Sequence, residues 1–416
     1  MTVTSTVSSA LTIGLRFFGI WPGVRYSTVY WFSFMSSLLI VQYFQYLYVF
    51  NHLKISELSN LVDSLIATFD YSLSFLKLGS LWMHRRIFNR ILTNMDKDWF
   101  ECANIDQHLH IMRIKANISH LFSNSLLIFN TIVAALYLSG DYIIHFIFLS
   151  GHYNDTLRQF PIKIQLPFEM QCTQSPIFEI IVVIIFVHAM LQVWTIATLN
   201  GLIFTLVLHV GGQIDIICHE LKSFSKDTLL RYFPVSSFRM LVERHNKVIS
   251  FSENIEQLFS FIGLMQVVWN TLLICCLGFV LIIVSNILNV QYDCCVLYFI
   301  HFDFCSLSSQ SVYNETGVFM LVKTVFAYLA ITTEAFIICF AGEYLSLKGA
   351  LIARATYETL WYDMPSDRSK YIIFIIMRSQ KRLAITAGKM MDLSFETFMT
   401  IMKASASYVS VLYAMY

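Results

Sequence analysis

The amino-acid sequence predicts an all-α membrane protein with seven transmembrane helices, whose N-terminus is cytoplasmic and whose C-terminus is extracellular. Hydrophobic residues make up 56% of the 416 positions and charged residues only 13%, about half the charged share of a soluble domain. So little charge could not cover a soluble globule. Apolar stretches long enough to cross a bilayer recur along the chain, and Lys and Arg gather on one side of them.

Seven stretches have the length of roughly 20 residues that a helix needs to cross the hydrocarbon core. They cover approximately residues 28–50, 61–82, 119–138, 176–210, 255–288, 316–345 and 391–416. Residues 371–377 are apolar but too short to span, and we expect a short inner helix there. We interpret the whole chain, residues 1–416, as a single transmembrane domain.

The residues before the first span are expected to form a helix at the membrane surface. Residues 11–21 are mostly apolar but are interrupted by Arg16, which is unlike a cleavable signal peptide. An amphipathic interfacial helix with Leu15, Phe18 and Gly19 on one side fits the pattern better.

The positions of Lys and Arg orient the bundle. Two precede the first span, six lie between spans two and three, and six lie between spans four and five, whereas the opposite side carries only Lys54, Arg158 and Lys163. By the positive-inside rule the N-terminus is cytoplasmic. This orientation is the reverse of that of a G-protein-coupled receptor.

Glycosylation sequons and cysteines agree with this orientation. Asn154 and Asn314 begin N-glycosylation sequons in predicted outside loops. Four cysteines also lie outside: Cys172, Cys294, Cys295 and Cys305. A disulfide from the first of these to one of the other three would persist there, and the remaining five cysteines are expected to be free.

Ionisable residues inside the predicted spans are exceptions that need a reason, because a charge in hydrocarbon is costly. Asp63, Asp70 and Lys77 share one face of the second span at a spacing of seven, and Lys323 and Glu334 lie close to one face of the sixth. One interpretation is structural, with paired charges that tie helices together. The other is that Asp70 and Lys323 border a ligand cleft in the outer half of the bundle.

Motifs of enzymes, cofactor sites and metal sites are absent from the sequence. We find no nucleophile elbow, zinc-binding HExxH, phosphate-binding loop or dinucleotide fingerprint. We therefore expect no enzymatic activity, no cofactor and no metal. The 28 Lys and Arg nearly balance the 27 Asp and Glu, so no basic field exists to attract nucleic acid.

Short strings in the C-terminal third resemble the insect odorant receptor family. They are FAGEYL at 340–345, ATYETLWY at 355–362, IMRSQKRL at 376–383, TAGK at 386–389 and SYVSVL at 407–412. Upstream, GIWP at 19–22 and SPIFE at 175–179 are also similar to family elements. The order and spacing of these strings, more than any one of them, make the resemblance specific.

The resemblance implies a subunit of an odorant-gated, non-selective cation channel that serves smell in the plasma membrane of a sensory dendrite. In that family, tuning subunits assemble with one shared co-receptor into heterotetramers. The family's pocket lies in the outer halves of spans two, three, four and six. Its cytoplasmic anchor corresponds to approximately residues 205–260 and 335–390, and its pore helix to approximately residues 391–416. This chain is similar to a tuning subunit, because it lacks the co-receptor's long insertion and reads SYVSVLYAM at 407–415 where the co-receptor reads TYFMVLVQL.

The candidate site residues follow from the resemblance together with helical spacing. For a small volatile organic odorant, the candidate pocket residues are Asp70, Ser74, Asn130, Ala134, Tyr137, Val182, Phe186, Met190, Phe319, Lys323 and Phe326. For the pore, the resemblance implies a gate at Val411 and Met415, and Tyr408 and Ala404 continue the same face inward. The alternative interpretation of the gate residues is ordinary packing of a terminal helix.

Two other functions stay open from the sequence. A gustatory-type ligand-gated channel would share the architecture, although the usual terminal pattern of that family matches residues 407–414 poorly. A metabotropic seven-helix receptor is the second alternative, and it would require the opposite orientation in the membrane.

Overall fold

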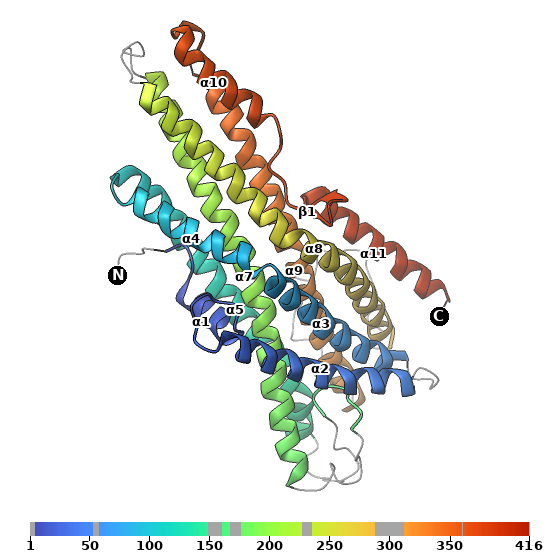
Figure 1. Ribbon diagram of the computed structural model, residues 1–416. Helices are drawn as coiled ribbons and strands as arrows, with labels where there is room; N and C mark the ends of the chain where they lie inside the picture. Colours follow the sequence, from blue (N-terminus) through green and yellow to red (C-terminus); the bar gives the residue numbers. More distant parts are fainter. Residues whose placement is uncertain are drawn as a thin grey trace.

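The computed structural model describes residues 5–52, 58–148, 160–166, 176–226, 235–287, 312–359 and 361–415, and these residues are almost entirely helical (Figure 1). Four helices precede the middle of the chain: α1 (Ser9–Phe17), α2 (Ser27–His52), α3 (Leu58–Met83) and α4 (Arg85–Cys102). Four long helices follow: α5 (Asp106–Phe148), α7 (Ile177–Lys226), α8 (Val235–Ile287) and α9 (Val312–Tyr357). The C-terminal part holds η3 (Trp361–Asp363), α10 (Ser366–Ser379), β1 (Thr386–Ala387), β2 (Met391–Asp392) and α11 (Phe395–Met415).

The long helices extend well beyond the predicted spans. Helices α7 and α8 contain 50 and 53 residues, which at 1.5 Å per residue is more than twice the ~30 Å thickness of a bilayer core. Figure 1 shows α7, α8 and α9 running side by side toward the end that carries α10. We call this the inner end, because the charge distribution predicts it to be cytoplasmic, and we call the opposite end the outer end.

Four helices in the described part of the chain are long and apolar enough to cross a membrane, and they lie in α5, α7, α8 and α9. The other three predicted spans coincide with α2, α3 and α11, which are helical over 26, 26 and 21 residues. Helices α3 and α11 carry charged residues in their sequences, among them Asp70 and Lys403, which lowers their apolar character. That these three helices cross the membrane remains a prediction.

Helix α7 forms the centre of the inner half of the bundle. Every residue in the range 195–214 is buried, which is typical of a helix enclosed on all sides. Gly211 lets the ring of Tyr344 on α9 come close, because a Cβ there would lie 2.6 Å from the Tyr344 hydroxyl oxygen. Helices α5, α8 and α9 pack around α7.

Helix α1 packs on α5 and α7, so protein contacts cover its buried apolar side. The Ser8 side chain caps its first turn by accepting a hydrogen bond from the Leu11 backbone N–H at 3.2 Å. Leu11 and Leu15 are buried, whereas Ile13 and Phe17 are exposed. The chain leaves α1 through Gly19, whose φ of 71° favours glycine.

The start of the last helix differs from the prediction, because residues 391–394 are not helical. The strands β1 and β2 form a short antiparallel hairpin, and Gly388 adopts a φ of 61° between them. The Thr386 backbone N–H donates to Glu256 of α8 at 2.7 Å, and the Gly388 N–H donates to the Ser260 carbonyl at 2.9 Å. These bonds hold the hairpin against α8, so α11 begins only at Phe395. The predicted short inner helix is present as the longer helix α10.

Candidate functional site

A buried polar cluster joins α3, α8 and α9. The Lys77 ammonium forms an ion pair with the Glu334 carboxylate, and their side chains are only 1% and 6% exposed. Gln266 of α8 adds a hydrogen bond from its Nε2 to the Glu334 backbone carbonyl, at 3.1 Å. The charges at positions 77 and 334 therefore tie helices together, as the structural interpretation of these residues expected.

Asp70 and Ser74, two predicted pocket residues on α3, share a partner on α7 that the sequence reasoning missed. Gln192 donates from Nε2 to the Ser74 hydroxyl at 2.7 Å, to the Asp70 backbone carbonyl at 3.1 Å and to the Asp70 carboxylate at 3.3 Å. Its other polar atom, Oε1, is buried and has no hydrogen-bond partner within the described residues. The signal that could have revealed Gln192 is a neutral amide inside an otherwise apolar span.

Tyr137 of α5 and Lys323 of α9, also predicted pocket residues, lie in contact. The Lys323 ammonium sits 4.2 Å from the centre of the Tyr137 ring, which is a cation–π geometry. This contact joins the outer parts of two helices through residues that are 186 positions apart in the sequence.

The other predicted pocket residues have varied environments. Val182, Phe186 and Met190 of α7 are half-buried, as is Phe326 of α9, whereas Ala134 is buried. Asn130 donates its side-chain amide to the Leu126 carbonyl of its own helix at 2.8 Å, so this donor is already used. The side chain of Phe319 lies outside the described part of the structure. The structure therefore brings together two groups, Asp70 with Ser74 and Tyr137 with Lys323.

Helix α11 presents the predicted pore residues beside its packed face. Ser405 donates to the Thr271 carbonyl of α8 at 3.3 Å, and Val409 packs against Gly278. On other sides of the helix, Tyr408 and Val411 are each 57% exposed. Ala404 is half-buried, and the side chain of Met415 lies outside the described residues.

Aromatic rings join α9 to the base of α11. Phe336 of α9 lies 5.8 Å from Phe395 and 5.6 Å from Phe398, measured between ring centres. One turn further along α9, Phe340 lies 6.3 Å from Phe395. The Glu343 carboxylate accepts the Phe395 backbone N–H at 3.4 Å, where a negative charge suits a helix N-terminus. A movement of α9 would therefore be transmitted to the start of α11.

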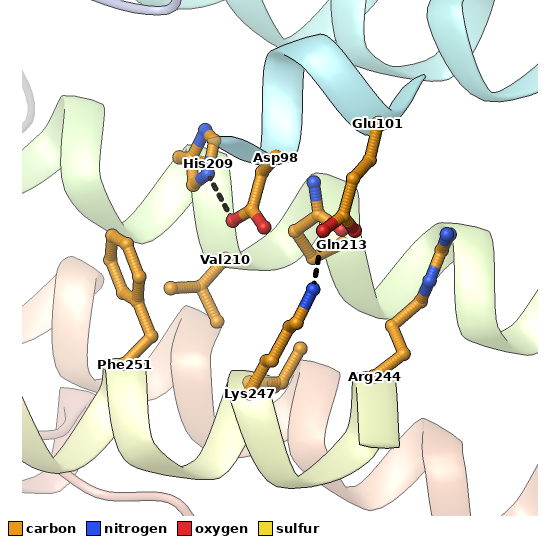
Figure 2. Close-up of a pocket in the computed structure, with 9 residues that line it drawn as sticks. Asp98, Glu101, His209, Val210, Gln213, Arg244, Lys247 and Phe251 are labelled. Carbon is orange, nitrogen blue, oxygen red and sulfur yellow. Dashed lines mark hydrogen bonds and ion pairs between the residues drawn. The ribbon is translucent and has the colours of Figure 1, made fainter. Parts of the chain in front are cut away.

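A small polar cavity lies nearer the inner end, between α4, α7 and α8 (Figure 2). Its volume is about 10 Å³, room for roughly one water molecule. The Lys247 ammonium and the Glu101 carboxylate form an ion pair of 2.5 Å at its edge. His209 and Asp98 form a second pair at 3.1 Å on its wall.

Hydrogen bonds around His209 hold the N-terminal segment against this cavity. The Trp99 indole N–H is only a donor, and it donates to the Thr6 hydroxyl at 3.0 Å. If Thr6 in turn donates to His209 Nδ1 at 3.1 Å, the His209 Nε2–H donates to Asp98. A hydroxyl, an imidazole and a carboxylate in sequence resemble a hydrolase triad, but Thr6 is fully buried. Its hydroxyl is hydrogen-bonded to both Trp99 and His209, so the arrangement holds the N-terminal segment in position.

The glycosylation and disulfide predictions fall largely on residues that the structure does not describe. Asn154 and the four outer cysteines Cys172, Cys294, Cys295 and Cys305 lie outside the described residues. Asn314 falls in the first turn of α9 rather than in a loop. Cys102, Cys218, Cys275, Cys276 and Cys339 are free thiols, as expected.

Comparison with known proteins gives a consistent result. The family model described as 7tm Odorant receptor matches residues 57–302 and 299–406 of this chain. Among curated proteins, Odorant receptor 13a of Drosophila melanogaster is 21% identical, over 93% of this chain and 87% of its own length. Odorant receptor 10 of Aedes albopictus is 22% identical, over 80% of this chain and 78% of its own length.

Solved structures show the same fold. The insect olfactory receptor OR5 from Machilis hrabei in complex with eugenol superposes with a TM-score of 0.73 at 13% identity, covering 98% of this chain and 97% of that one. The structure of the same receptor described without eugenol superposes with a TM-score of 0.70 at 14% identity, covering 97% and 96% of the two chains.

Proposed function

This chain belongs to the odorant receptor family, and we propose that it is an odour-tuning subunit of an odorant-gated, non-selective cation channel. In this proposal it assembles with the shared co-receptor into a heterotetramer in the plasma membrane of a sensory dendrite. The observation that carries the proposal is the course of α9, which contacts the buried polar cluster through Glu334 and the base of α11 through Phe336.

The odorant pocket is proposed to lie in the outer half of the bundle, among α3, α5, α7 and α9. Support comes from the polar groups at Asp70, Gln192 and Lys323, which are set among half-buried apolar side chains such as Phe186 and Met190. A few polar groups in an apolar surround are typical of sites for small organic ligands. OR5 was solved in complex with eugenol, a ligand of that chemical kind bound by a receptor of the same fold.

Gating is proposed to pass along α9 to α11. A ligand that binds more tightly to one position of α9 would shift the population toward that position. Because Phe336 stacks on Phe395 and Phe340 lies against the same ring, the base of α11 would follow. In a tetramer the stripe of Val411 and Met415 would form an apolar ring that blocks ions while it is dry, and moving the helices apart would wet the ring.

Assembly is proposed to use the inner end. Several large apolar side chains outside the predicted spans are exposed: Tyr357, Tyr362, Phe374, Met377 and Met390. Exposed apolar surface of this kind marks sites of protein association. The proposed anchor, approximately residues 205–260 and 335–390, contains all five of these residues.

Co-expression tests the proposal. The chain is expressed in oocytes with and without an odorant receptor co-receptor, and currents are recorded while a broad odour panel is applied. We expect odour-evoked cation current only when both subunits are present. A current without the partner would contradict the obligate heteromer. If the two subunits reach the cell surface together but give no odour-evoked current, the proposed channel function is contradicted.

Epitope tags separate the channel from a metabotropic receptor. We expect an N-terminal tag to be reached by antibody only after permeabilisation and a C-terminal tag to be reached on intact cells. The reverse pattern would favour the metabotropic alternative. A gustatory-type channel is distinguished by ligands, because it would respond to non-volatile tastants in preference to the odour panel.

A further inference from the structure

A second, larger hollow lies at the inner end, between α5, α7 and α9. Its volume is about 460 Å³, far more than the small cavity beside His209 and enough for a ring-sized ligand. Ile111, Leu351 and Ala355 contribute apolar surface, and Asp215, Lys222, Arg354 and Glu358 contribute charge. We call this hollow the inner groove. It is separate from the proposed odorant pocket and from α11.

The charges at the inner groove do not balance. Asp215 is held by two lysines at once, Lys115 at 2.9 Å and Lys348 at 2.5 Å, so this group of three carries one surplus positive charge. Arg354 is balanced by Glu358 at 2.9 Å. Lys222 is exposed on the rim and adds a further positive charge. The charges that line the groove cancel, with Lys222 and Arg354 against Asp215 and Glu358. The surplus of two positive charges comes from Lys115 and Lys348, which pair with Asp215 from outside the lining.

Tyr344 holds the two half-buried lysines in place. Lys115 donates to the Tyr344 hydroxyl at 3.1 Å, and the ammonium groups of Lys115 and Lys348 lie 5.8 and 5.7 Å from the centre of its ring. Because these side chains are already ordered by protein contacts, an anion that joins them loses little further conformational entropy. The arrangement is therefore a preorganised positive site.

The depth of the inner groove suits a ligand from the inner membrane surface. Lys348 lies three residues beyond the predicted end of the sixth span at residue 345, and Arg354 lies nine residues beyond it. At 1.5 Å per residue along a helix, these positions are about 5 and 14 Å below the boundary. A headgroup that projects from the bilayer meets cations at successive depths on one wall.

We propose that the inner groove binds a multiply phosphorylated inositol ring, either as the headgroup of a phosphoinositide or as a soluble inositol phosphate. Basic pockets between transmembrane helices on the cytoplasmic side recognise such headgroups. Several phosphates on one ring match cations at several depths, and the apolar surface of Ile111 and Leu351 accommodates the ring. The site goes beyond the proposed channel function and does not depend on an odorant.

Binding to the full-length chain tests this site directly. The protein is purified in phosphatidylcholine nanodiscs, and fluorescent phosphatidylinositol bisphosphate in the disc is measured by energy transfer to a donor on the protein. Inositol trisphosphate added to lipid-free detergent samples is the soluble probe, and phosphatidylserine in the disc is the probe for a general anionic surface. Preference for either inositol probe over phosphatidylserine supports the site, and the stronger of the two identifies the source.

Substitutions at the rim locate the binding. Lys222→Gln and Arg354→Gln remove cations without changing the two half-buried lysines that pair with Asp215. Each is expected to weaken binding about fivefold, and the double variant about 30-fold. Arg239→Gln is the matched control, because Arg239 is 78% exposed against 77% for Arg354 and also pairs with a Glu four residues later. It is expected to bind as the wild type does.

Three results would overturn the proposal. The first is the absence of binding to both inositol probes, and the second is binding of phosphatidylserine as tight as that of the bisphosphate. The third is an equal loss in Arg239→Gln, which would indicate general surface electrostatics. The absence of an odour-evoked current would not affect these binding measurements. The proposed function and the proposed ligand of the inner groove can therefore be contradicted independently.

Discussion

Lys77 and Glu334 form an ion pair inside the helix bundle, with side chains that are almost completely shielded from solvent. A buried pair of opposite charges adds little stability by itself, since its desolvation offsets its attraction. Its effect appears when one member is removed, because the other is then left as an unpaired buried charge. This asymmetry makes α3 and α9 dependent on each other.

Removing one charge of this pair should destabilise the protein strongly. We expect Lys77→Met to lower the free energy of unfolding by about 3–5 kcal/mol, because Glu334 would be left charged and unpaired. The double variant Lys77→Met/Glu334→Met should recover most of the loss. The measurement is thermal unfolding of the purified protein, followed by a thiol-reactive dye.

The exposed pair of Arg239 and Glu243 is the control for that experiment. It has the same charges at 3.4 Å but is largely open to solvent, and such pairs contribute about 0.5 kcal/mol or less. Arg239→Gln should hardly change the unfolding temperature. A double variant at 77 and 334 that is less stable than either single variant would contradict the argument.

The unpartnered Oε1 of Gln192 predicts a ligand preference that rests on the proposed function. A buried acceptor without a donor is costly, so an odorant with a hydroxyl group would gain a hydrogen bond there. We expect alcohols to activate the channel at about tenfold lower concentration than their methyl ethers. Gln192→Leu should remove this difference while leaving the response to the ethers in place. Concentration–response curves of the co-expressed channel measure both effects.

Gln45 provides a matched control for Gln192. Its side-chain amide is equally buried, and neither of its polar atoms has a partner in the described residues. It lies on α2, whose Gln42 and Tyr46 contact α3 at Ser72. Gln45→Leu should leave the preference for alcohols unchanged. If the most potent agonists lack a hydroxyl group altogether, the role given to Gln192 is wrong.

Cys102 and Phe100, two residues apart on α4, should differ in reactivity. Cys102 is 1% exposed, and burial raises the pKa of its thiol, whereas Phe100 is 77% exposed. A raised pKa keeps the thiol protonated at neutral pH, and the protonated form is a poor nucleophile. We expect Phe100→Cys to react rapidly with maleimide from the cytoplasmic side, while the native thiol of Cys102 stays slow. Rapid labelling of Cys102 in the folded protein would contradict its position against α7.

Much of the helical architecture follows from local signals in the sequence. Apolar runs located α5, α7, α8 and α9, because a helix must satisfy its own backbone inside a bilayer. Their inner extensions were underestimated, since residues 211–226 of α7 mix charges with apolar residues as a soluble helix does. The hairpin before α11 was missed for a different reason. Its two short strands depend on contacts to Glu256 and Ser260, which lie about 130 positions away.

The candidate site was predictable only in part. Helical spacing placed Asp70 and Lys77 on one face of α3, but the partners of these residues depend on how helices pack, which spacing does not reveal. Gln192 and Glu334 became their partners through the packing of α7 and α9 on α3. The pairing of Lys323 with Tyr137 has the same origin. The sequence therefore identified the charged residues within the spans, but it did not identify the residues that contact them.

If the proposed function is right, substitutions in the pocket and substitutions at the gate should have different effects on the channel. Val411 is exposed on the side of α11 that is proposed to face the pore, so Val411→Asn would help water to enter the apolar ring. We expect a larger leak current and an unchanged rank order of odorants. Tyr137→Ala removes the ring over which Lys323 sits, and it should reorder the odorants while leaving leak and ion conduction alone. Both are measured in the same co-expressed channel, with Ser410→Asn as a control on a neighbouring exposed face of α11. If Val411→Asn reorders the odorants and Tyr137→Ala raises the leak, the two assignments are wrong, because each side chain would then act at the other's site.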